Sequence, residues 1–525
     1  MFDGDLGTAL VASARRHAER PALWARGTRL TYRELFERAA GWAAAMRAAG
    51  LARGERVCVL SNRSATAYAG ILAALLAGAT YVPLNARFPR ERNRAIFAAA
   101  DPAALILDDE NRVHLDSLLG DGPRAPLVVA PESGPLPAST GRRVLTASDL
   151  PGVALEKFDG GADPNAPAYL LFTSGTTGVP KGVPIDHRNV AAYMSAMHRL
   201  LPLGAEDRVL QSSDLTFDQS VHDMFLTWLS GAELYATPPD ASIMAPRFIA
   251  EFGLTACHFV PSIATRAFDR GLLKPGGMPT LRYTAFGGEA LPVAIVRPWA
   301  EAAPNSAIFN FYGPTEGTVY FSSYRLDPDR PLDMAVAPVG RPLGEQRIAL
   351  FDGDGREVAK GETGEIHLAG SQLMRGYWRA PDLDAAKFTE IGGVRWYKTG
   401  DLGRIVDDYG IVFAGRVDRQ AKIRGYRVEL QEIEGAVRKV SAREQVAVIA
   451  WPPSDNGVAD TCIAFVVAPE GDADAVRAGC RAVLPSYMVP SDVLFVAELP
   501  LNQNGKVDYA ALSRHDALQG LTFRQ

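Results

Sequence analysis

The chain has 525 residues, of which 47% are hydrophobic and 22% charged, and its formal net charge is −5. This length is typical of about two to four domains, and the lack of a basic excess or of a long Lys/Arg run argues against a nucleic-acid partner. The acidic start lacks an apolar secretory core, and the four cysteines are widely spaced, as in buried thiols of a reducing compartment. The eight histidines form no His-x-x-x-His motif, which argues against zinc. We therefore expect a cytoplasmic protein without a membrane partner.

Apolar β-rich runs alternate with Ala-rich helical stretches through the first part of the chain. Arg56–Ser61 and Ala103–Leu107 predict strands. The charge-free stretch Ala65–Leu84 is long enough to span a membrane, but its Ala, Thr and Gly content favours a buried helix, a cap at Gly78 and a strand at Thr80–Leu84. This alternation predicts an α/β fold with mostly parallel sheets.

The later part of the chain has a different pattern. Gly120–Gly161 is rich in Pro, Gly, Ser and Asp and predicts a segment that runs over the surface. From about Gly361 short antiparallel strands are expected around a turn at Asp407–Gly410. We predict a large N-terminal domain over residues 1–417 and a small α+β C-terminal domain over residues 418–525. The elements predicted for the small domain are a helix at Gln431–Val440, strands at Gln445–Ala450 and Thr461–Ala468, and a helix at Ala473–Leu484.

Residues 173–182 read Thr-Ser-Gly-Thr-Thr-Gly-Val-Pro-Lys-Gly and directly follow Ala168–Phe172, which predicts a buried strand. Glycines let backbone N–H groups approach an anion, the hydroxyls add donors, and Lys181 adds a mobile positive charge. The segment therefore predicts a loop that holds a triphosphate. It is not a Walker A loop, because the Gly-Lys-Ser/Thr spacing is missing. A flexible surface linker is the alternative, and the buried strand before the loop argues against it.

More motifs follow in a fixed order. They are Leu30–Leu35, Leu76–Leu84, Phe217–Phe225, Gly287–Leu291, Asn310–Glu316, Gly364–Ile366, Arg375–Trp378, Tyr397–Leu402, Gly415–Asp418, Lys422–Glu429, Leu484–Pro490 and Asn504–Asp508. As an ordered series they resemble the adenylation domains of nonribosomal peptide synthetases, within the superfamily of acyl-CoA synthetases and luciferases. The resemblance covers about residues 20–510, with departures at Asn85, where Asp is usual, and at Gln431, where Gly is usual. No carrier-protein serine motif or condensation-domain His-His motif follows, so we expect a free-standing enzyme.

The resemblance implies that a carboxylate attacks the α-phosphate of ATP and expels pyrophosphate with the help of Mg²⁺. It implies that Lys506 bridges the carboxylate and the α-phosphate, that Thr315 donates to the α-phosphate, and that Glu316 binds Mg²⁺. It also implies that the small domain moves about a hinge at Asp418, which withdraws Lys506. The aminoacyl group then passes to the phosphopantetheine thiol of a carrier protein acting in trans.

The resemblance also assigns the nucleotide contacts. The β- and γ-phosphates are expected on the 173–181 loop, adenine on Tyr312, and the ribose hydroxyls on Asp401 with Arg416 alongside. The full set of expected contacts is Thr173, Ser174, Gly175, Thr176, Thr177, Gly178, Lys181, Gly288, Glu289, Ala290, Asn310, Phe311, Tyr312, Asp401, Arg416 and Lys506. Taken singly, Asp401 could be a turn aspartate after Gly400 and Lys506 a solvated lysine. Within the ordered series we favour the functional interpretation of both.

The substrate pocket is expected around Asp218, which the resemblance pairs with the α-ammonium of an amino acid; a buried ammonium without a carboxylate would be unfavourable. Motif matching places the other pocket residues at Gln219, His222, His258, Thr284, Phe286, Phe311, Val319 and Tyr320. The bulky aromatic members predict a short substrate side chain, and the polar members favour a polar one. A protonated histidine would favour an acidic side chain. Alternatively, both histidines are packed with satisfied ring nitrogens.

Three functions remain in competition. The leading hypothesis is an ATP-dependent ligase that adenylates a short, polar α-amino acid and loads a separate carrier protein. The second is an acyl-CoA ligase for a small non-amino carboxylic acid, against which Asp218 and the Tyr312–Glu316 motif argue. The third is a non-catalytic binding module, which would not require the charged residues assigned to ATP and to catalysis. The sequence is silent on the small helper protein that some relatives need and on the oligomeric state.

Overall fold

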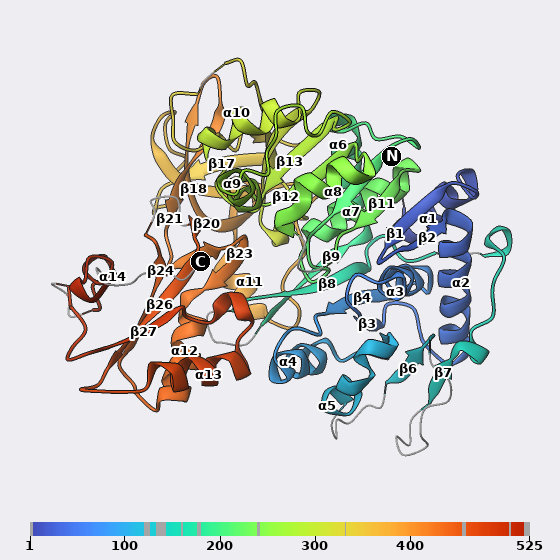
Figure 1. The fold of residues 1–525 in the computed structure, drawn as a ribbon, viewed down its shortest axis with the longest axis horizontal. Helices are drawn as coiled ribbons and strands as arrows, with labels where there is room; N and C mark the ends of the chain where they lie inside the picture. Colours follow the sequence, from blue (N-terminus) through green and yellow to red (C-terminus); the bar gives the residue numbers. More distant parts are fainter. Residues whose placement is uncertain are drawn as a thin grey trace.

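The computed structural model describes residues 4–119, 126–132, 143–158, 161–175, 180–238, 242–330, 332–453, 458–502 and 506–518. In this part of the chain, the strands form five sheets (Figure 1). Two large sheets, of seven and nine strands, build the first two thirds of the chain, and three smaller sheets follow.

The seven-stranded sheet has the order β7-β6-β5-β3-β4-β8-β9. Its strands are β3 (Arg56–Leu60), β4 (Thr80–Leu84), β5 (Ala104–Leu107), β6 (Leu127–Ala130), β7 (Val144–Thr146), β8 (Pro167–Thr173) and β9 (Lys181–Asp186). All pairs are parallel except β8 with β9, which form an antiparallel hairpin in which Thr173 pairs with Lys181. The hairpin therefore holds the two ends of the predicted phosphate loop side by side.

The nine-stranded sheet has the order β16-β15-β14-β13-β12-β10-β11-β1-β2. Its strands are β1 (Pro21–Ala25), β2 (Thr28–Thr31), β10 (Arg208–Gln211), β11 (Glu233–Ala236), β12 (Ala256–Phe259), β13 (Tyr283–Gly287), β14 (Ala307–Tyr312), β15 (Ser322–Leu326) and β16 (Arg341–Pro342). The strands from β14 through β1 run parallel. Ligands bind at the carboxyl ends of such strands, where β12, β13 and β14 carry predicted site residues.

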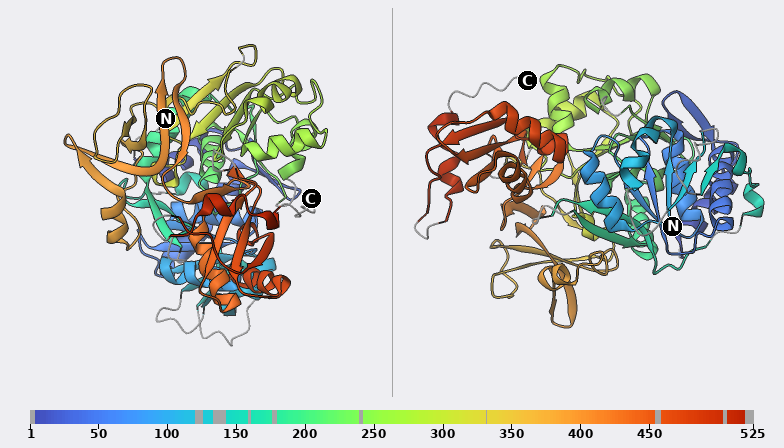
Figure 2. Two further views of the ribbon diagram at one scale, coloured as in Figure 1. Left: turned by 90° about the vertical axis from the view of Figure 1, so that its left-hand side faces the viewer. Right: turned by 90° about the horizontal axis from the view of Figure 1, so that it is seen from below.

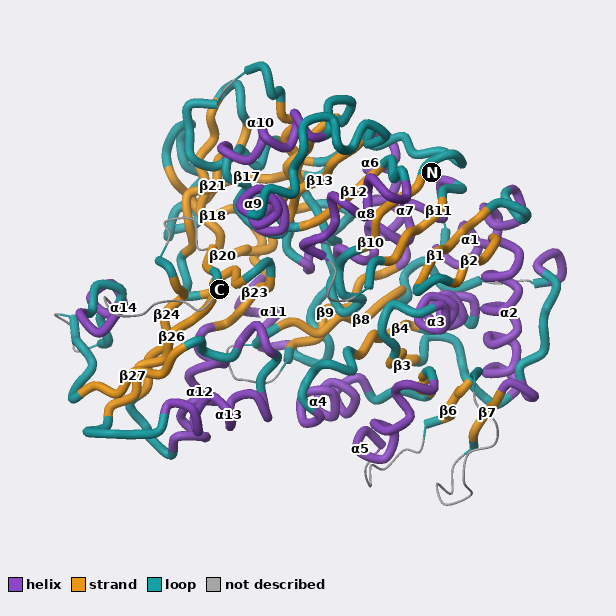
Figure 3. The backbone as a smooth tube through the Cα atoms, viewed as in Figure 1, coloured by secondary structure: helices purple, strands orange, loops and turns teal. Residues whose placement is uncertain are grey.

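Helices pack against both large sheets (Figure 3). They are α1 (Leu6–Arg16), α2 (Tyr32–Ala48), α3 (Ala65–Leu76), α4 (Arg90–Ala100), α5 (Leu115–Leu119), α6 (His187–Leu200), α7 (Gln219–Ser230), α8 (Ala245–Phe252), α9 (Pro261–Asp269), α10 (Val293–Ala302) and α11 (Pro381–Lys387). One core cluster joins α1, α2, α3, α6 and α7 to strands of both large sheets. Within the described residues, none of the helices combines the length and apolarity that crossing a membrane requires.

A five-stranded antiparallel sheet leads into the C-terminal part. It contains β17 (Arg347–Phe351), β18 (Thr363–Ala369), β19 (Phe388–Ile391), β20 (Val394–Val406) and β21 (Gly410–Arg416). Two three-stranded sheets and three helices follow, and Figure 2 shows them as a lobe on one side of the molecule. Their elements are β22 (Gln420–Ile423), β23 (Tyr426–Glu429), α12 (Leu430–Ser441), β24 (Val446–Trp451), β25 (Val458–Ala459), β26 (Thr461–Val467), α13 (Ala473–Val483), β27 (Asp492–Val496) and α14 (Tyr509–Leu512).

The predicted fold class, α/β with a large, mostly parallel part and a small α+β part, is confirmed. The small part has a core of its own, built from residues between Ala421 and Val493. The boundary at Asp418 stays a prediction. The charge-free stretch forms α3 and β4 as expected, with Gly78 at φ 73° between them.

The prediction that Gly120–Gly161 only runs over the surface was wrong in part. The segment contains β6 and β7, which pair in parallel at the edge of the seven-stranded sheet. Each strand has only three or four residues. The flanking Pro, Gly and Ser residues dominated the local composition. The short β-branched runs of the two strands were therefore not recognised as strands.

Candidate active site

The phosphate loop begins and ends within the described residues. The Ser174 hydroxyl donates to the main-chain carbonyl of Arg427 at 2.9 Å, so the loop contacts the C-terminal part directly. The Thr173 hydroxyl is buried without a hydrogen-bond partner among the described residues. A buried orphan hydroxyl at this position fits a ligand that brings oxygen acceptors. The predicted contacts at Thr176, Thr177 and Gly178 lie outside the described residues.

Glu316 lies in a short 3-10 turn, η6 (Thr315–Gly317), and is completely buried. One of its carboxylate oxygens lies 3.2 Å from Lys181 Nζ and accepts from the Tyr377 hydroxyl at 2.7 Å. The other lies 3.0 Å from Arg427 Nη1, on β23 of the C-terminal part. Burial alone would raise the pKa of Glu316, but Arg427 and Lys181 hold it well below its usual range. The ionised carboxylate suits Mg²⁺, and the two cations beside it suit phosphate oxygens.

The predicted adenine contacts line one small cavity. Its walls include Gly288, Glu289, Ala290, Asn310, Phe311, Tyr312 and Lys422. Glu289 Oε1 and Asn310 Oδ1 are buried and have no hydrogen-bond partner within the described chain. Both are acceptors, so a purine with an exocyclic amino group would satisfy them. These orphan atoms fit the adenine ring of ATP.

Asp401 belongs to β20 and is buried, so the alternative of an ordinary turn aspartate is wrong. The Tyr312 hydroxyl donates to it at 2.6 Å, and Arg416 pairs with its other oxygen. Arg416 also holds Asp418 through two bonds of 2.7 and 2.8 Å. One guanidinium thus links the expected ribose residue to the expected hinge residue.

Lys506 is not brought to this centre. Its side chain is exposed, and its main chain exchanges hydrogen bonds with Asn502. It lies three residues before α14, which Figure 1 shows at the outer end of the C-terminal lobe. Arg427, from the same lobe, stands beside Glu316 instead. The catalytic role of Lys506, and its withdrawal for carrier loading, stay predictions.

Asp218 directly precedes α7 and is half-buried. The Thr315 hydroxyl and the main-chain N–H of Gln219 both hydrogen-bond with its carboxylate. Burial nevertheless raises the pKa of Asp218 to about 6. In this arrangement Thr315 thus faces Asp218. A carboxylate with so little solvation would gain strongly from a cationic partner.

Aromatic rings close the space behind Asp218. His222, one helical turn further along α7, lies 4.9 Å from the His258 ring centroid in an edge-on arrangement. Tyr320 stacks on Phe311 at 5.2 Å, and Val319 before it is buried with φ 68°. We call His222, His258, Phe311 and Tyr320 the aromatic wall.

Thr284 and Phe286, both predicted for the pocket, lie on the face of β13 that is turned away from the aromatic wall. The Thr284 hydroxyl accepts from the Trp299 indole N–H at 2.9 Å, and the Phe286 ring packs on Trp299 at 5.5 Å. Side chains alternate along a strand, so the positions that face the wall are Ala285 and Gly287. A Cβ on Gly287 would lie 2.2 Å from the Tyr320 hydroxyl. The motif matching was displaced by one residue at this strand.

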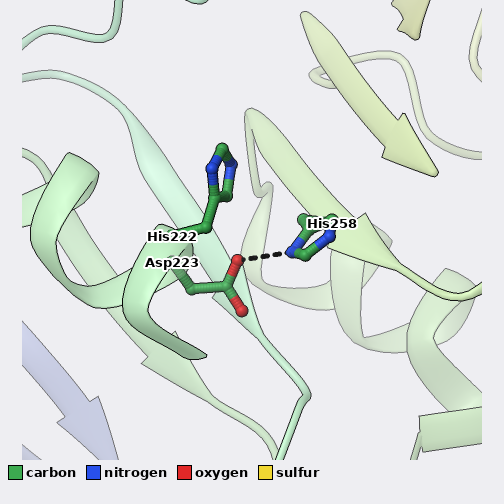
Figure 4. Close-up of side chains that lie close together, drawn as sticks. All are labelled: His222, Asp223 and His258. Carbon is green, nitrogen blue, oxygen red and sulfur yellow. Dashed lines mark hydrogen bonds and ion pairs between the residues drawn. The ribbon is translucent and has the colours of Figure 1, made fainter. Parts of the chain in front are cut away.

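The structure gathers His222, Asp223 and His258, a cluster that no sequence spacing indicated (Figure 4). Their potential ligand atoms lie within 4.8 Å of one another. His258 Nδ1 lies 2.9 Å from Asp223, His258 Nε2 lies 2.5 Å from the Tyr320 hydroxyl, and His222 Nδ1 lies 2.7 Å from the Tyr193 hydroxyl. These nitrogens are therefore already satisfied.

Both pocket histidines are neutral. Burial lowers the pKa of His258 to about 3 and the pKa of His222 well below its usual value. Burial therefore disfavours a protonated histidine that selects an acidic substrate.

A cleft of about 260 Å³ separates the large part from the C-terminal lobe. Its walls include Phe217, Gln219, Val260, Arg266, Arg424, Gly425, Tyr426 and Tyr487. Gln219 lies at the pocket end, where its amide donates towards the Gly287 carbonyl at 3.4 Å. Gly425 has φ 86°, and a Cβ there would lie 2.7 Å from Val260, so only glycine lets the lobe approach this closely. The sequence analysis did not foresee this cleft, although the motifs at 422–429 and 484–490 supply its outer wall.

Comparison with known proteins gives consistent matches. The profile described as AMP-binding enzyme matches residues 10–378, and that of the AMP-binding enzyme C-terminal domain matches residues 432–506. Tyrocidine synthase 2 of Brevibacillus parabrevis is 33% identical over 506 residues, which cover 95% of this chain and 13% of that protein. Enterobactin synthase component F of Escherichia coli is 32% identical over 96% of this chain and 39% of its own length. The chain thus spans well under half of these relatives.

Solved structures agree. The Vibrio cholerae adenylation domain AlmE, in complex with glycyl-adenosine-5'-phosphate, is 31% identical with a TM-score of 0.89 and covers 99% of both chains. IdnL7 is 33% identical with a TM-score of 0.73 and covers 99% of this chain and 100% of its own.

Proposed function

The chain belongs to the AMP-binding enzyme family, and from this membership we propose that it activates a short α-amino acid as aminoacyl-AMP. The membership confirms the resemblance to adenylation domains and the predicted class, an adenylate-forming ligase. The half-buried carboxylate of Asp218, close enough to Tyr320 of the aromatic wall to raise its pKa, is the observation that carries the amino-acid assignment. It offers an α-ammonium a partner and leaves little room for a side chain.

The first step joins the substrate carboxylate to the α-phosphate of ATP and releases pyrophosphate. Glu316 would hold Mg²⁺, and Lys181 would neutralise charge on the departing phosphates. Lys506 has to enter the site for this step, which requires the lobe to turn about Asp418. The Arg416–Asp418 pair at the start of the lobe is suited to that hinge, because it is an ion pair at an element end.

The second step passes the aminoacyl group to a thiol. The sulfur of a phosphopantetheine arm bonds to the carbonyl carbon, and the bond from that carbon to the AMP oxygen breaks. AMP leaves with the electron pair, and the thiol proton passes to solvent. The cleft between the lobe and the large part supports this proposal, because it reaches Gln219 beside the pocket. A carrier protein in trans is the proposed source of the arm.

Side-chain length, rather than polarity, is the proposed basis of selection. His258 and Tyr320 are bonded to each other, and Thr284 faces away from the pocket, so these polar groups do not await a polar substrate. An acyl-CoA ligase for a non-amino acid is less favoured, because it would leave the half-buried Asp218 without a cation. The four cysteines, all described, are free and buried, which suits the reducing cytoplasm proposed here.

ATP–pyrophosphate exchange tests this function. Exchange is measured with each amino acid and with short carboxylic acids that lack an amino group, in MgCl₂ and in EDTA. We expect Mg²⁺-dependent exchange with short α-amino acids only. Exchange with the unaminated acids alone would overturn the proposal. Mass spectrometry after addition of phosphopantetheine tests the second step, with an aminoacyl thioester as the expected product.

A further inference from the structure

A chain of hydrogen bonds runs behind the aromatic wall. It begins at Asp223 on α7, which contacts His258 Nδ1 on β12 at 2.9 Å. His258 Nε2 in turn contacts the Tyr320 hydroxyl at 2.5 Å, and the Gln219 side chain acts on that hydroxyl so as to lower its pKa. All of these groups except Gln219 are at least nine-tenths buried. Asp223 is the end of the chain opposite Gln219, and the sequence analysis assigned it no role.

The residues at the two ends of this hydrogen-bond chain, Gln219 and Asp223, indicate which group donates and which accepts in each bond. Gln219 lowers the pKa of Tyr320, which is the effect of a donor that faces the Tyr320 oxygen. The Tyr320 O–H is then free to donate to His258 Nε2. Neutral His258 therefore carries its proton on Nδ1 and donates it to Asp223 Oδ1. Asp223 Oδ1 accepts in this tautomer, which holds the Tyr320 hydroxyl, and burial raises the pKa of Asp223 well above its usual value.

The backbone of Tyr320 is also fixed. Thr318 and Val319 before it have φ of 61° and 68°, an unfavourable conformation for such residues that needs support from its surroundings. The Gln372 amide donates to the Tyr320 carbonyl at 2.7 Å and to the Gly317 carbonyl at 3.2 Å. The ring therefore has one position, stacked on Phe311 with its hydroxyl against Gly287.

There is spare space on the far side of this wall. A cavity with room for about one water lies among His222, Asp223, Leu226, Cys257, His258 and Ala285. The second oxygen of Asp223 is buried there without a hydrogen-bond partner among the described residues. His222 and His258 of the aromatic wall border this cavity, and His258 is the residue that holds the Tyr320 hydroxyl.

We infer that Asp223 is a positioning residue, which acts through His258 to hold Tyr320 as the floor of the amino-acid pocket and so limits the enzyme to glycine and alanine. The inference rests on the proposed amino-acid activation and names its substrate class. Asp223 would not touch the substrate. Its effect is on which side chains fit.

The test compares kcat/KM in pyrophosphate exchange for glycine, alanine, valine and leucine. Wild-type enzyme should prefer glycine and alanine. In Asp223→Ala the glycine-to-valine ratio should fall about ten-fold, the lower range for one or two methylenes in a pocket. Asp223→Asn keeps an acceptor oxygen and should retain the wild-type ratio. Thr284→Val, on the opposite face of β13, is the matched control and should leave the ratio unchanged.

Circular dichroism shows whether Asp223→Ala folds. If it does not fold, Tyr320→Phe, which removes only the hydroxyl, tests the inference in its place. It should lower the same ratio. An equal fall for all four amino acids in the variants would mean a merely structural role and would overturn the inference. Wild-type preference for valine or leucine would also overturn it while leaving amino-acid activation intact. Exchange with no amino acid at all would instead overturn the proposed function.

Discussion

The amino-acid pocket and the lobe interface hold their polar groups in opposite ways. In the pocket, Asp223, His258 and Tyr320 form a buried chain of bonds within the large part, and the histidine is neutral. At the lobe interface, full charges meet: Arg427 of the lobe pairs with Glu316, and Arg92 of the large part pairs with Glu432 at 2.5 Å. The pocket bonds lie within the large part, whereas the interface pairs join the large part to the lobe.

The difference fits the functions proposed above for the two regions. A pocket that selects by size needs one fixed shape, and satisfied buried hydrogen bonds rigidify a core. A lobe that alternates needs contacts that ligands can replace. A buried ion pair serves this purpose, since Mg²⁺ or phosphate can take the place of either partner without leaving the other charge unpaired.

The largest expected effect on activity comes from Lys506, which contacts neither the pocket chain nor the charged lobe interface in this arrangement. Lys506→Ala should lower adenylate formation by about a hundred-fold or more, the scale of losing one preorganised charge at the reacting centre. ATP binding should remain measurable by calorimetry. Lys360→Ala, at another exposed lysine that pairs with Asp407, is the control and should behave as wild type. Near-normal turnover of Lys506→Ala would show that the lobe need not move for the first step.

Asp218→Asn tests the pocket side of the comparison. It removes the only charge expected to meet the α-ammonium, and kcat/KM for amino acids should fall about a hundred-fold, the cost of leaving a buried charge without its partner. Pyrophosphate exchange measures this loss, and ATP affinity is the internal control. An unchanged substrate profile would remove the ammonium assignment.

Much of this site could be predicted from local sequence. The Thr173–Lys181 loop follows a buried strand, and its hairpin places Lys181 beside Glu316 as the phosphate chemistry requires. The α3 helix and β4 strand followed from an uncharged stretch with a glycine between them. Such features depend on residues that are neighbours in the sequence, so local composition and periodicity are enough to predict them.

The rest depends on long-range topology. Asp223, His258 and Tyr320 are far apart in sequence and meet only because α7, β12 and the turn after β14 converge. The one-residue displacement at Thr284 and Phe286 has a related cause: a strand turns alternate side chains to opposite faces, so a shift of one reverses them all. The contact of Arg427 with Glu316 depends on the position of the lobe, which no local pattern encodes.

The pH profile sharpens the pocket side further. Burial raises the pKa of Asp218 to about 6, so the carboxylate is ionised above that pH and protonated below it. Only the ionised form binds the ammonium, and kcat/KM should fall about ten-fold for each pH unit below the pKa. Asp218→Asn should lose this acid limb. If kcat/KM of the wild-type enzyme is constant from pH 7 to pH 5, ionisation of Asp218 does not control substrate binding, and this prediction is contradicted.

The smallest effect is expected at the lobe interface, where the contacts are exchangeable. Arg427→Gln should slow thioester formation with phosphopantetheine by about ten-fold, because Glu316 then lacks one of the charges that hold the lobe in this arrangement. Pyrophosphate exchange should change by only a few-fold, since in the proposed first step Lys506 stands in place of Arg427. Arg330→Gln, at an exposed pair with Asp408, is the matched control and should alter neither step. Equal losses in both steps would mean that Arg427 acts in a fixed site, and the contrast between the pocket and the interface would then fail.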